Sequence, residues 1–342
     1  MSESNQQEPV ESTLITNSQA TMKEKSHLLP FSNWWPPIVG ALVGLALRLV
    51  FMARPGSPFS AMNWQFILLA PIAVGAVTVY FAEIKVRRSW KYYIGASAMA
   101  NVLFVLGTML ILIEGLICAI IIVPLFAIVG AIGGLIMGAI CRRTNWPKQA
   151  VYSFAILPLL LGLIPPDDSV RQPFALSERT IKIDATPEKI WHQLHNVSNI
   201  KPDEVGQAWM YRIGVPLPLA GVTQVTTEGL VRKITMGKSI HFDQISNDWQ
   251  KNRYVKWRYR FYIDSFPPKA LDDHVKIGGH YFDIIDTEYI LTPIGQKSTE
   301  LKIRMHYRVS TQFDWYANPV GKLLIGNFEE VILNFYRLRS MS

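Results

Sequence analysis

The pattern of hydrophobic positions divides the chain into two halves that meet near residue 166. In the first half, long apolar segments are separated by short polar connections, whereas in the second half apolar and polar positions alternate. Ahead of both halves, residues 1–33 are rich in Ser, Gln, Asn, Thr and Glu and have no periodic apolar face. This composition predicts a disordered tail rather than a folded element.

Five apolar segments within residues 34–166 are candidate membrane spans. They are Trp34–Met52, Trp64–Ala82, Tyr92–Ile113, Gly115–Cys141 and Gln149–Pro166. A helix needs about 20 apolar residues to cross the hydrocarbon core of a bilayer, and the first four segments meet this requirement. The fifth is short and contains Pro158. It either crosses the membrane or only dips into it, and we favour a full crossing.

The Lys and Arg residues of this half predict its orientation. Most of them lie in connections 83–91 and 142–148, whereas connection 53–63 carries only Arg54 and the turn at Glu114 carries none. Basic connections tend to stay in the cytoplasm, so the N-terminus is expected there as well. With five crossings the C-terminal half lies on the outer face of the membrane. If the fifth segment only dips in, the C-terminal half lies in the cytoplasm.

Few polar side chains interrupt the apolar segments. We interpret Glu114 as marking the turn between the third and fourth segments rather than as an intramembrane site. Asn101 is expected to hydrogen-bond between helices. Small residues that suit close helix contact recur at Gly130, Gly133, Gly134 and Gly138. No pair of charged residues within the segments suggests an ion path, which disfavours a transporter.

Residues 179–342 are predicted to form an α+β domain around an antiparallel sheet, after a polar linker at 167–178. In residues 253–263 and 299–309, apolar side chains alternate strictly with charged or polar ones. Such alternation indicates a sheet with one apolar face and one wet face. A strand at 179–184 and further strands near 222–234, 238–245 and 281–291 complete the sheet.

Two helices accompany the predicted sheet. Thr186 and Pro187 have the residue types of an N-cap and a first helical position, so a short helix is expected over 187–194. The final helix is expected to begin near Pro319. Its apolar stripe is Val320, Leu324, Phe328, Val331, Phe335 and Leu338. A sheet that curves around this long C-terminal helix leaves space for a hydrophobic cavity.

Several segments of this half resemble a known superfamily. The stretch Ile181–Trp191 (IKIDATPEKIW) resembles the opening of the polyketide cyclase/dehydrase–lipid transport group of the START-like (SRPBCC, helix-grip) superfamily. Gly229–Arg232, His274–Asp283 and Phe313–Ala317 resemble a membrane-anchored bacterial branch of it. The resemblance implies a helix-grip domain with a cavity for a lipid, polyketide or other apolar ligand. It also implies a bacterial inner membrane location, and it brings no shared catalytic motif.

Composition and charge narrow the function further. The 342 residues are 49% hydrophobic and only 18% charged, below the roughly 25% charged residues of typical soluble domains. The formal net charge is +8, but its surplus lies in the connections of the apolar half. That location favours a lipid bilayer over a nucleic acid as the partner. Two cysteines exclude a disulfide scaffold and a four-thiolate zinc site.

Six residues are candidate ligand contacts. Trp257, Tyr259, Met305 and Tyr307 lie on the apolar sheet face and would line a cavity, or else form plain core beneath the final helix. Trp209 and Tyr211 precede a Gly/Pro-rich segment and could form a flap over the cavity, with structural packing as the alternative.

Three residues are weak candidates for acid–base catalysis. Asp283 alternates with Ile285 and Leu291, which places it on the inward face of its strand, where desolvation would raise its pKa. The alternative is a strand-end or bulge position that faces water. His274 and His280 bracket a Gly-rich loop, and loops at cavity mouths often carry function.

No metal site or cofactor is predicted. His192 and His195 are three residues apart on a predicted helix, but no acidic residue completes a known ligand spacing, so a solvated face is the favoured interpretation. His306 lies between Arg304 and Arg308 and is expected at the surface.

We therefore favour a membrane-anchored protein that holds a small hydrophobic ligand next to the bilayer. The rival hypothesis is a cyclase/dehydratase-type enzyme that uses a cavity carboxylate, His or Tyr as acid or base, and a third is a structural role with the cavity filled by side chains. The sequence does not fix the ligand or the oligomeric state.

Overall fold

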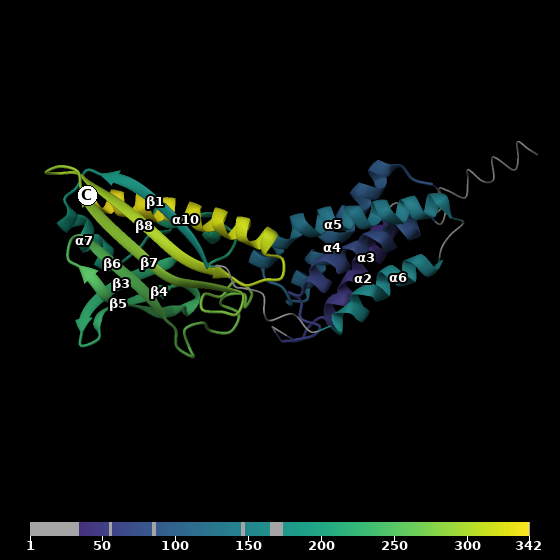
Figure 1. The fold of residues 1–342 in the computed structure, drawn as a ribbon, viewed down its shortest axis with the longest axis horizontal. Helices are drawn as coiled ribbons and strands as arrows, with labels where there is room; N and C mark the ends of the chain where they lie inside the picture. Colours follow the sequence, from purple (N-terminus) through teal and green to yellow (C-terminus); the bar gives the residue numbers. More distant parts are fainter. Residues whose placement is uncertain (1–33, 55–56, 84–86, 145–147, 165–173, 342) are drawn as a thin grey trace, which may run out of the picture.

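The computed structural model describes residues 34–54, 57–83, 87–144, 148–164 and 174–341. Two parts follow one another along the long axis of the molecule, a helical bundle and an α+β domain (Figure 1). The expected tail at 1–33 and residues 167–173 of the expected linker lie outside the described residues.

The bundle is formed by the helices of the first half. They are α2 (Trp35–Val50), α3 (Trp64–Glu83), α4 (Trp90–Leu110), α5 (Leu116–Arg143) and α6 (Lys148–Gly162). By length and composition, α3, α4 and α5 are suited to cross a membrane, whereas α2 and the apolar part of α6 are shorter. The helix in the first expected span is therefore shorter than predicted. The helix ends at Val50. The side chain of Arg48, in its last turn, donates a hydrogen bond to the carbonyl of Phe51, the residue that follows the helix.

Helix α6 runs alongside α3 from one end of the bundle to the other. Near its start, Val151 packs with Tyr80 and Met137. At its end, the Gly162 carbonyl accepts a hydrogen bond from the Phe59 amide, next to the start of α3. The fifth apolar segment thus connects both ends of the bundle.

Small residues bring α3 and α5 into backbone contact, as the glycine spacing predicts. A Cβ atom at Gly75 would lie 1.9 Å from the Gly130 carbonyl oxygen, and one at Gly133 would lie 2.3 Å from that of Ile72. Asn101 of α4 donates hydrogen bonds to the Ser97 carbonyl at 2.9 Å and to the Pro71 carbonyl of α3 at 3.4 Å. These contacts give the bundle its tight packing.

The second half forms an eight-stranded antiparallel sheet in the order β1-β8-β7-β6-β5-β4-β3-β2. The strands are β1 (Phe174–Ile183), β2 (Asn196–Val197), β3 (Pro218–Thr226), β4 (Gly229–Met236), β5 (His241–Gln250), β6 (Tyr254–Arg260), β7 (Phe282–Pro293) and β8 (Thr299–Val309). Short helices α7 (Pro187–His195), α8 (Pro202–Val205) and α9 (Trp209–Arg212) lie between β1 and β3.

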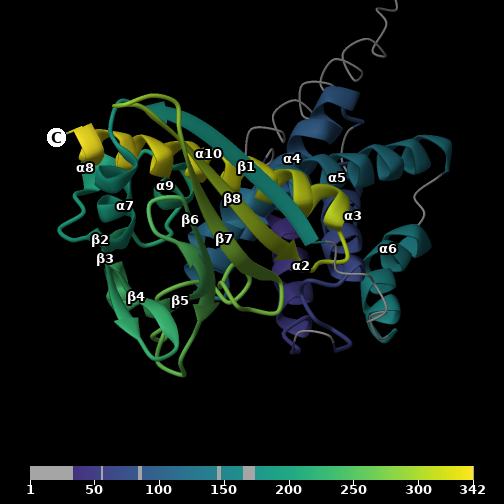
Figure 2. The same cartoon turned by 60° about the vertical axis from the view of Figure 1, so that its left-hand side comes forward.

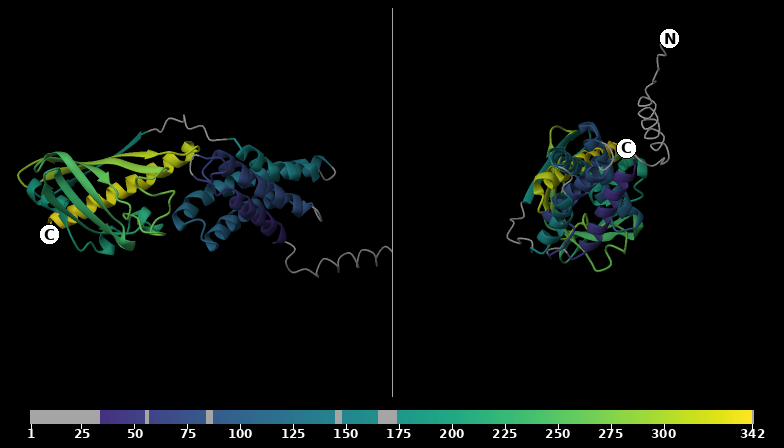
Figure 3. Two further views of the ribbon diagram at one scale, coloured as in Figure 1. Left: turned by 90° about the horizontal axis from the view of Figure 1, so that it is seen from below. Right: turned by 90° about the vertical axis from the view of Figure 1, so that its right-hand side faces the viewer.

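The long helix α10 (Asp314–Met341) packs along the sheet, with its first turns next to the bundle and its C-terminal end far from it (Figures 1 and 3). Every second residue of β8 is buried, from Thr299 to Val309, as the alternation predicts. Figure 2 shows the curved strands and α10 from a second direction. The predicted architecture is confirmed: a helical region is followed by an antiparallel sheet that curves around a long C-terminal helix.

Some boundaries differ from those predicted. The expected strand at 222–234 is a hairpin of β3 and β4, because Gly229 adopts φ +106° and turns the chain. Strand β1 begins at Phe174 rather than Arg179, since its first residues also pair with β8. Their inward-facing side chains are small or polar, so they lack the apolar alternation. Helix α10 begins at Asp314 and contains Pro319 within it.

Candidate functional site

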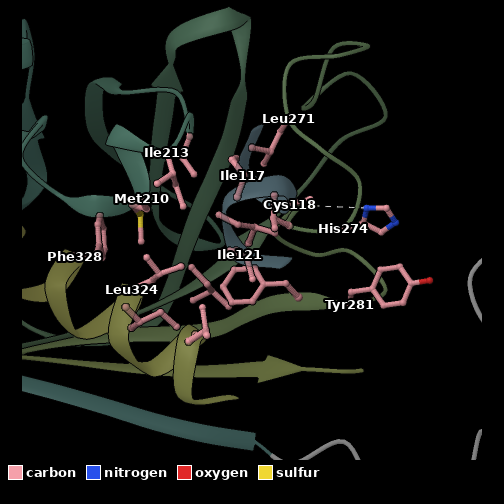
Figure 4. A pocket seen from close by; sticks show the side chains of 18 of the residues that line it. Ile117, Cys118, Ile121, Met210, Ile213, Leu271, His274, Tyr281, Leu324 and Phe328 are labelled. Atoms are coloured by element: carbon pink, nitrogen blue, oxygen red, sulfur yellow. Dashed lines mark hydrogen bonds between the residues drawn. The ribbon is translucent and has the colours of Figure 1, made fainter. Parts of the chain in front are cut away.

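A cavity of about 350 Å³ lies between the sheet, α9, α10 and the adjacent end of the bundle. In Figure 4, Met210 of α9 and Phe328 and Leu324 of α10 line one part of it, and Ile117 and Ile121 of α5 line another. Its volume falls within the range of about 300–1,000 Å³ that is typical of small-molecule sites.

The wall of this cavity is shared by the two halves of the chain. Helices α2, α3, α4 and α5 and the α2–α3 connection all contribute side chains, among them Met62, Phe66, Phe104, Ile117 and Phe126. The packing of Phe313 and Tyr316 against the core of the bundle holds the two halves together. The α+β domain alone would therefore leave the cavity open at one end, and the side chains of the bundle close that end.

Most of the lining is apolar, and its polar side chains form two groups. One group lies where the halves meet and includes Arg48, Glu114, Cys118 and His274. The other lies on the sheet and the C-terminal part of α10 and includes Arg232, Gln244, Tyr289 and Tyr336. An apolar passage with polar ends is suited to an elongated molecule that is itself mainly apolar.

The first group, which we call the junction cluster, links three segments of the chain. Arg48 at the end of α2 pairs with Glu114 at 2.7 Å, in the turn that precedes α5. His274 Nδ1 lies 3.0 Å from Asp272, 3.5 Å from Glu114 and 3.7 Å from the sulfur of Cys118. The Gly115 amide donates to Asp272 at 2.9 Å. Glu114 does mark the turn, as predicted, and it also anchors the α+β domain.

Mutual charge stabilises the ionised forms in the junction cluster. Burial disfavours the charged form of His274, but hydrogen bonds with Asp272, Cys118 and Glu114 outweigh burial and raise its pKa to about 12. Burial alone would raise the pKa of Asp272, yet the hydrogen bonds from His274 lower it well below its usual range. Two cations, Arg48 and His274, therefore offset two carboxylates.

Two groups of side chains have the spacing of metal ligands. In the junction cluster, one ligand atom each from Glu114, Cys118, Asp272 and His274 lies within 4.8 Å of the others. The sequence did not predict this group, because its members are up to 160 residues apart. The carboxylates already have cationic partners there, so the cluster is accounted for as an ion-pair network.

The second group lies on the outer face of the sheet and comprises Asp286, Glu288 and His306. Lys256 lies 2.9 Å from Glu288 and 3.2 Å from Asp286, and His306 Nδ1 lies 2.6 Å from Asp286. These contacts also form an ion-pair network. His306 was expected at the surface, and it is half-buried in this network.

The six expected ligand contacts divide into three kinds. Tyr211, Tyr259 and Met305 line the cavity. Trp257 and Tyr307 are buried in the domain core and are absent from the lining, which corresponds to the alternative interpretation. Trp209 is 43% exposed and is absent from the lining, and its role in a flap stays a prediction.

Of the three expected catalytic candidates, only His274 lines the cavity. His280 is exposed. Asp283 pairs across the sheet with Arg308 and accepts a hydrogen bond from the Gly278 amide at 2.9 Å. The inward placement of Asp283 is wrong because a β-bulge between Ile284 and Asp286 shifts the alternation, so Phe282 and Ile284 face the cavity instead. Burial still raises the pKa of Asp283.

His195 also differs from its expected place on a solvated face. It is 6% exposed, and its ring lies 4.1 Å from that of Trp191 and 5.6 Å from that of Trp257. Burial lowers its pKa to about 4. His195 is therefore a neutral core residue, because its ring packs against the rings of Trp191 and Trp257.

Sequence reasoning missed the cavity residues Arg232 and Tyr336 and the junction cluster as a unit. A signal for Arg232 was present, since it interrupts the apolar alternation of Leu230, Ile234 and Met236 on one face of β4. The expectation of one long strand over 222–234 concealed that pattern. The junction cluster had no local signal, since it assembles residues from distant segments.

Comparisons with known proteins found similarity to solved structures over about half of the chain. No protein-family model matches the chain, and no curated protein matches it. The solved structures that are similar include a START superfamily protein from Mycobacterium smegmatis, with 14% identity, 48% of this chain and 97% of that chain covered, and a TM-score of 0.32. The Zhui aromatase/cyclase from Streptomyces sp. R1128 is similar at 11% identity, with 49% of this chain and 94% of that chain covered and a TM-score of 0.31.

A truncated norcoclaurine synthase from Thalictrum flavum is similar at 12% identity, with 49% of this chain and 98% of that chain covered and a TM-score of 0.26. At these identities and scores, the similarities do not assign a function.

Proposed function

We propose that this protein is membrane-anchored and holds a hydrophobic ligand in the cavity that its bundle and its helix-grip domain share. The observation that carries the proposal is the continuity of the apolar lining from Phe328 and Leu324 of α10 to Phe66 and Phe104 of the bundle. A ligand that leaves the bilayer along the bundle would meet apolar side chains throughout. Apolar area removed from water then favours binding by about 25 cal/mol per Å².

The charge distribution supports a location of the helix-grip domain on the side of the membrane away from the cytoplasm. The end of the bundle that is far from this domain carries Arg87, Arg88, Arg142 and Arg143 around the α3–α4 and α5–α6 connections. At the near end, Arg48 is paired with Glu114. Because basic connections favour the cytoplasmic side, the far end would be cytoplasmic.

The enzyme hypothesis loses two of its three named catalytic residues, because Asp283 and His280 lie outside the lining. The third, His274, is held in ion pairs with Asp272 and Glu114. The tyrosines that could serve as acid or base, among them Tyr211 and Tyr259, do line the cavity. We favour ligand binding without chemical change because most of the remaining lining is apolar.

Native mass spectrometry of the full chain, released from detergent, tests the proposal, with solvent extraction to identify what is bound. We expect one hydrophobic molecule per chain. Leu324→Trp should weaken this loading, since Leu324 lines the cavity and the larger indole would narrow it. Leu323→Trp is the matched control, because Leu323 is 57% exposed on the same helix.

An unloaded native chain that also takes up no lipid from added extracts would refute the proposal, as would equal loading of both Trp variants. A bound molecule that is converted during incubation would instead support the enzyme hypothesis.

A further inference from the structure

Arg232 is a buried cation on the inward face of β4. It is 6% exposed and lines the cavity, between Leu230 and Ile234 on the same face of the strand. A guanidinium stays protonated in proteins, so its charge persists despite burial. Burial of an uncompensated charge is costly unless a partner is present.

The hydrogen bonds of Arg232 use only part of its capacity. Nη1 donates to Gln244 Oε1 at 3.4 Å and Nη2 donates to the Tyr336 hydroxyl at 3.2 Å, while Nε, although buried, has no partner among the described residues. No carboxylate in the described part of the chain forms an ion pair with it, and tyrosines dominate its surroundings. A guanidinium has five N–H donors, so the side chain is equipped to bind an anion that arrives from outside.

The neighbouring strand is shaped to hold this guanidinium. A Cβ atom at Gly221 of β3 would lie 2.7 Å from Nε and 2.8 Å from Nη2 of Arg232. Only glycine leaves this space free for the guanidinium in its present position. Gly221 itself lines the cavity, which places the guanidinium at its wall.

Arg232 lies at the end of the cavity that is far from the bundle. Its partner Tyr336 and the lining residue Ala317 are both on α10, and Ala317 packs against the core of the bundle. Nineteen residues separate them, and a rise of about 1.5 Å per residue gives a separation of roughly 28 Å. A cavity of about 350 Å³ that extends over this length is narrow, so it suits one extended chain.

We infer that the ligand is a single-chain amphiphile with an anionic head group, carboxylate or phosphate, that binds Arg232 while its tail extends toward the bundle. This inference rests on the proposed function and adds the head group and the orientation. Charge-assisted hydrogen bonds from Arg232 and hydroxyls such as that of Tyr336 would hold the head group. Burial in an apolar cavity strengthens these bonds.

Binding of tritiated hexadecanoate to the full chain in phosphatidylcholine nanodiscs tests the inference, with empty nanodiscs as the blank. Unlabelled hexadecanoate, hexadecyl phosphate and hexadecanol serve as competitors. We expect the alcohol to compete roughly 10- to 100-fold more weakly than the better of the two anions. The order of the two anions then shows which head group the site prefers.

Arg232→Gln should weaken binding of the anions by a similar factor and leave that of hexadecanol unchanged, measured with tritiated hexadecanol. Lys233→Gln is the matched control, because Lys233 is exposed on the opposite face of the same strand and loses the same charge. The competition series on the native chain needs no variant, so it decides the question even if Arg232→Gln does not fold.

Hexadecanol that competes as well as the anions, or unchanged anion binding to Arg232→Gln, would overturn the inference and leave the hydrophobic cavity intact. If none of the three ligands binds, the inference of a single-chain anionic amphiphile fails, and the native mass spectrometry described above decides the proposed function separately.

Discussion

Glu329 is a buried carboxyl group on α10 that lies outside the cavity lining. It has no solvent exposure, and its Oε2 atom accepts a hydrogen bond from the Ser177 hydroxyl of β1 at 2.6 Å. Oε1 has no hydrogen-bond partner in the described part of the chain. Burial disfavours the carboxylate and raises the pKa of Glu329 to about 7.

This raised pKa makes the stability of the α+β domain depend on pH. Well below pH 4.5, the carboxyl is protonated in both the folded and the unfolded chain. As the pH rises from there to about 7, the carboxyl ionises in the unfolded chain before it does in the folded chain. The free energy of unfolding therefore falls, by roughly 3 kcal/mol in all. Glu329→Gln should remove this loss.

Thermal unfolding of the full chain in detergent, at about pH 5 and about pH 8, measures the effect. The melting temperature of Glu329→Gln minus that of the native chain should be larger at about pH 8 than at about pH 5. Glu330→Gln, one residue along and exposed, is the control. An equal difference between Glu329→Gln and the native chain at both pH values would contradict the expectation.

At the scale of single elements, the contact between α3 and α5 depends on glycine. A Cβ atom at Gly75 would meet the carbonyl oxygen and carbon of Gly130 and the amide of Gly134, all of them backbone atoms that no side-chain rotation can move. Helices α3 and α5 would have to separate to accept even a methyl group. Forced overpacking of this kind costs about 1–3 kcal/mol.

Gly75→Ala is therefore expected to lower the melting temperature of the full chain in detergent by several degrees. Gly95→Ala in α4 is the matched control, because a Cβ atom there would meet nothing within 4 Å, and alanine is the better helix former. An unchanged melting temperature for Gly75→Ala, with Gly95→Ala also unchanged, would show that α3 and α5 do not pack as described.

Elements with strict local patterns were predictable from the sequence, and features that depend on a local irregularity were not. The alternation in β8 placed Leu301, Ile303 and Met305 correctly on the inward face. One bulge in β7 was enough to reverse Asp283, because a period of two changes face with each extra residue. Strict alternation in β6 and β8 also made it possible to predict Tyr259 and Met305 as cavity residues. The residues of the junction cluster follow no pattern along the chain, so the cluster could not be predicted.

At the scale of the whole molecule, the charged ends of the bundle predict its sidedness. We expect a cysteine at position 251, at the exposed tip of the β5–β6 hairpin, to react with a membrane-impermeant maleimide on intact cells. A cysteine at position 87, in the exposed part of the α3–α4 connection, should react only after permeabilisation.

Lys251→Cys and Arg87→Cys therefore form a matched pair, and the native chain with its own Cys118 and Cys141 gives the background. Labelling of Arg87→Cys but not of Lys251→Cys on intact cells would reverse the proposed orientation.

The shared cavity wall has a consequence for any attempt to work with the α+β domain alone. Side chains such as Phe66, Phe104 and Ile117 close the cavity from the bundle side. Without them, Phe313, Ala317 and Val320 would face water at the rim of an open apolar funnel. The excised domain should then dimerise through that rim or adsorb to detergent. In the intact chain, a ligand that fills the cavity would contact side chains of both the bundle and the α+β domain. Ligand binding should therefore also strengthen the association of these two parts.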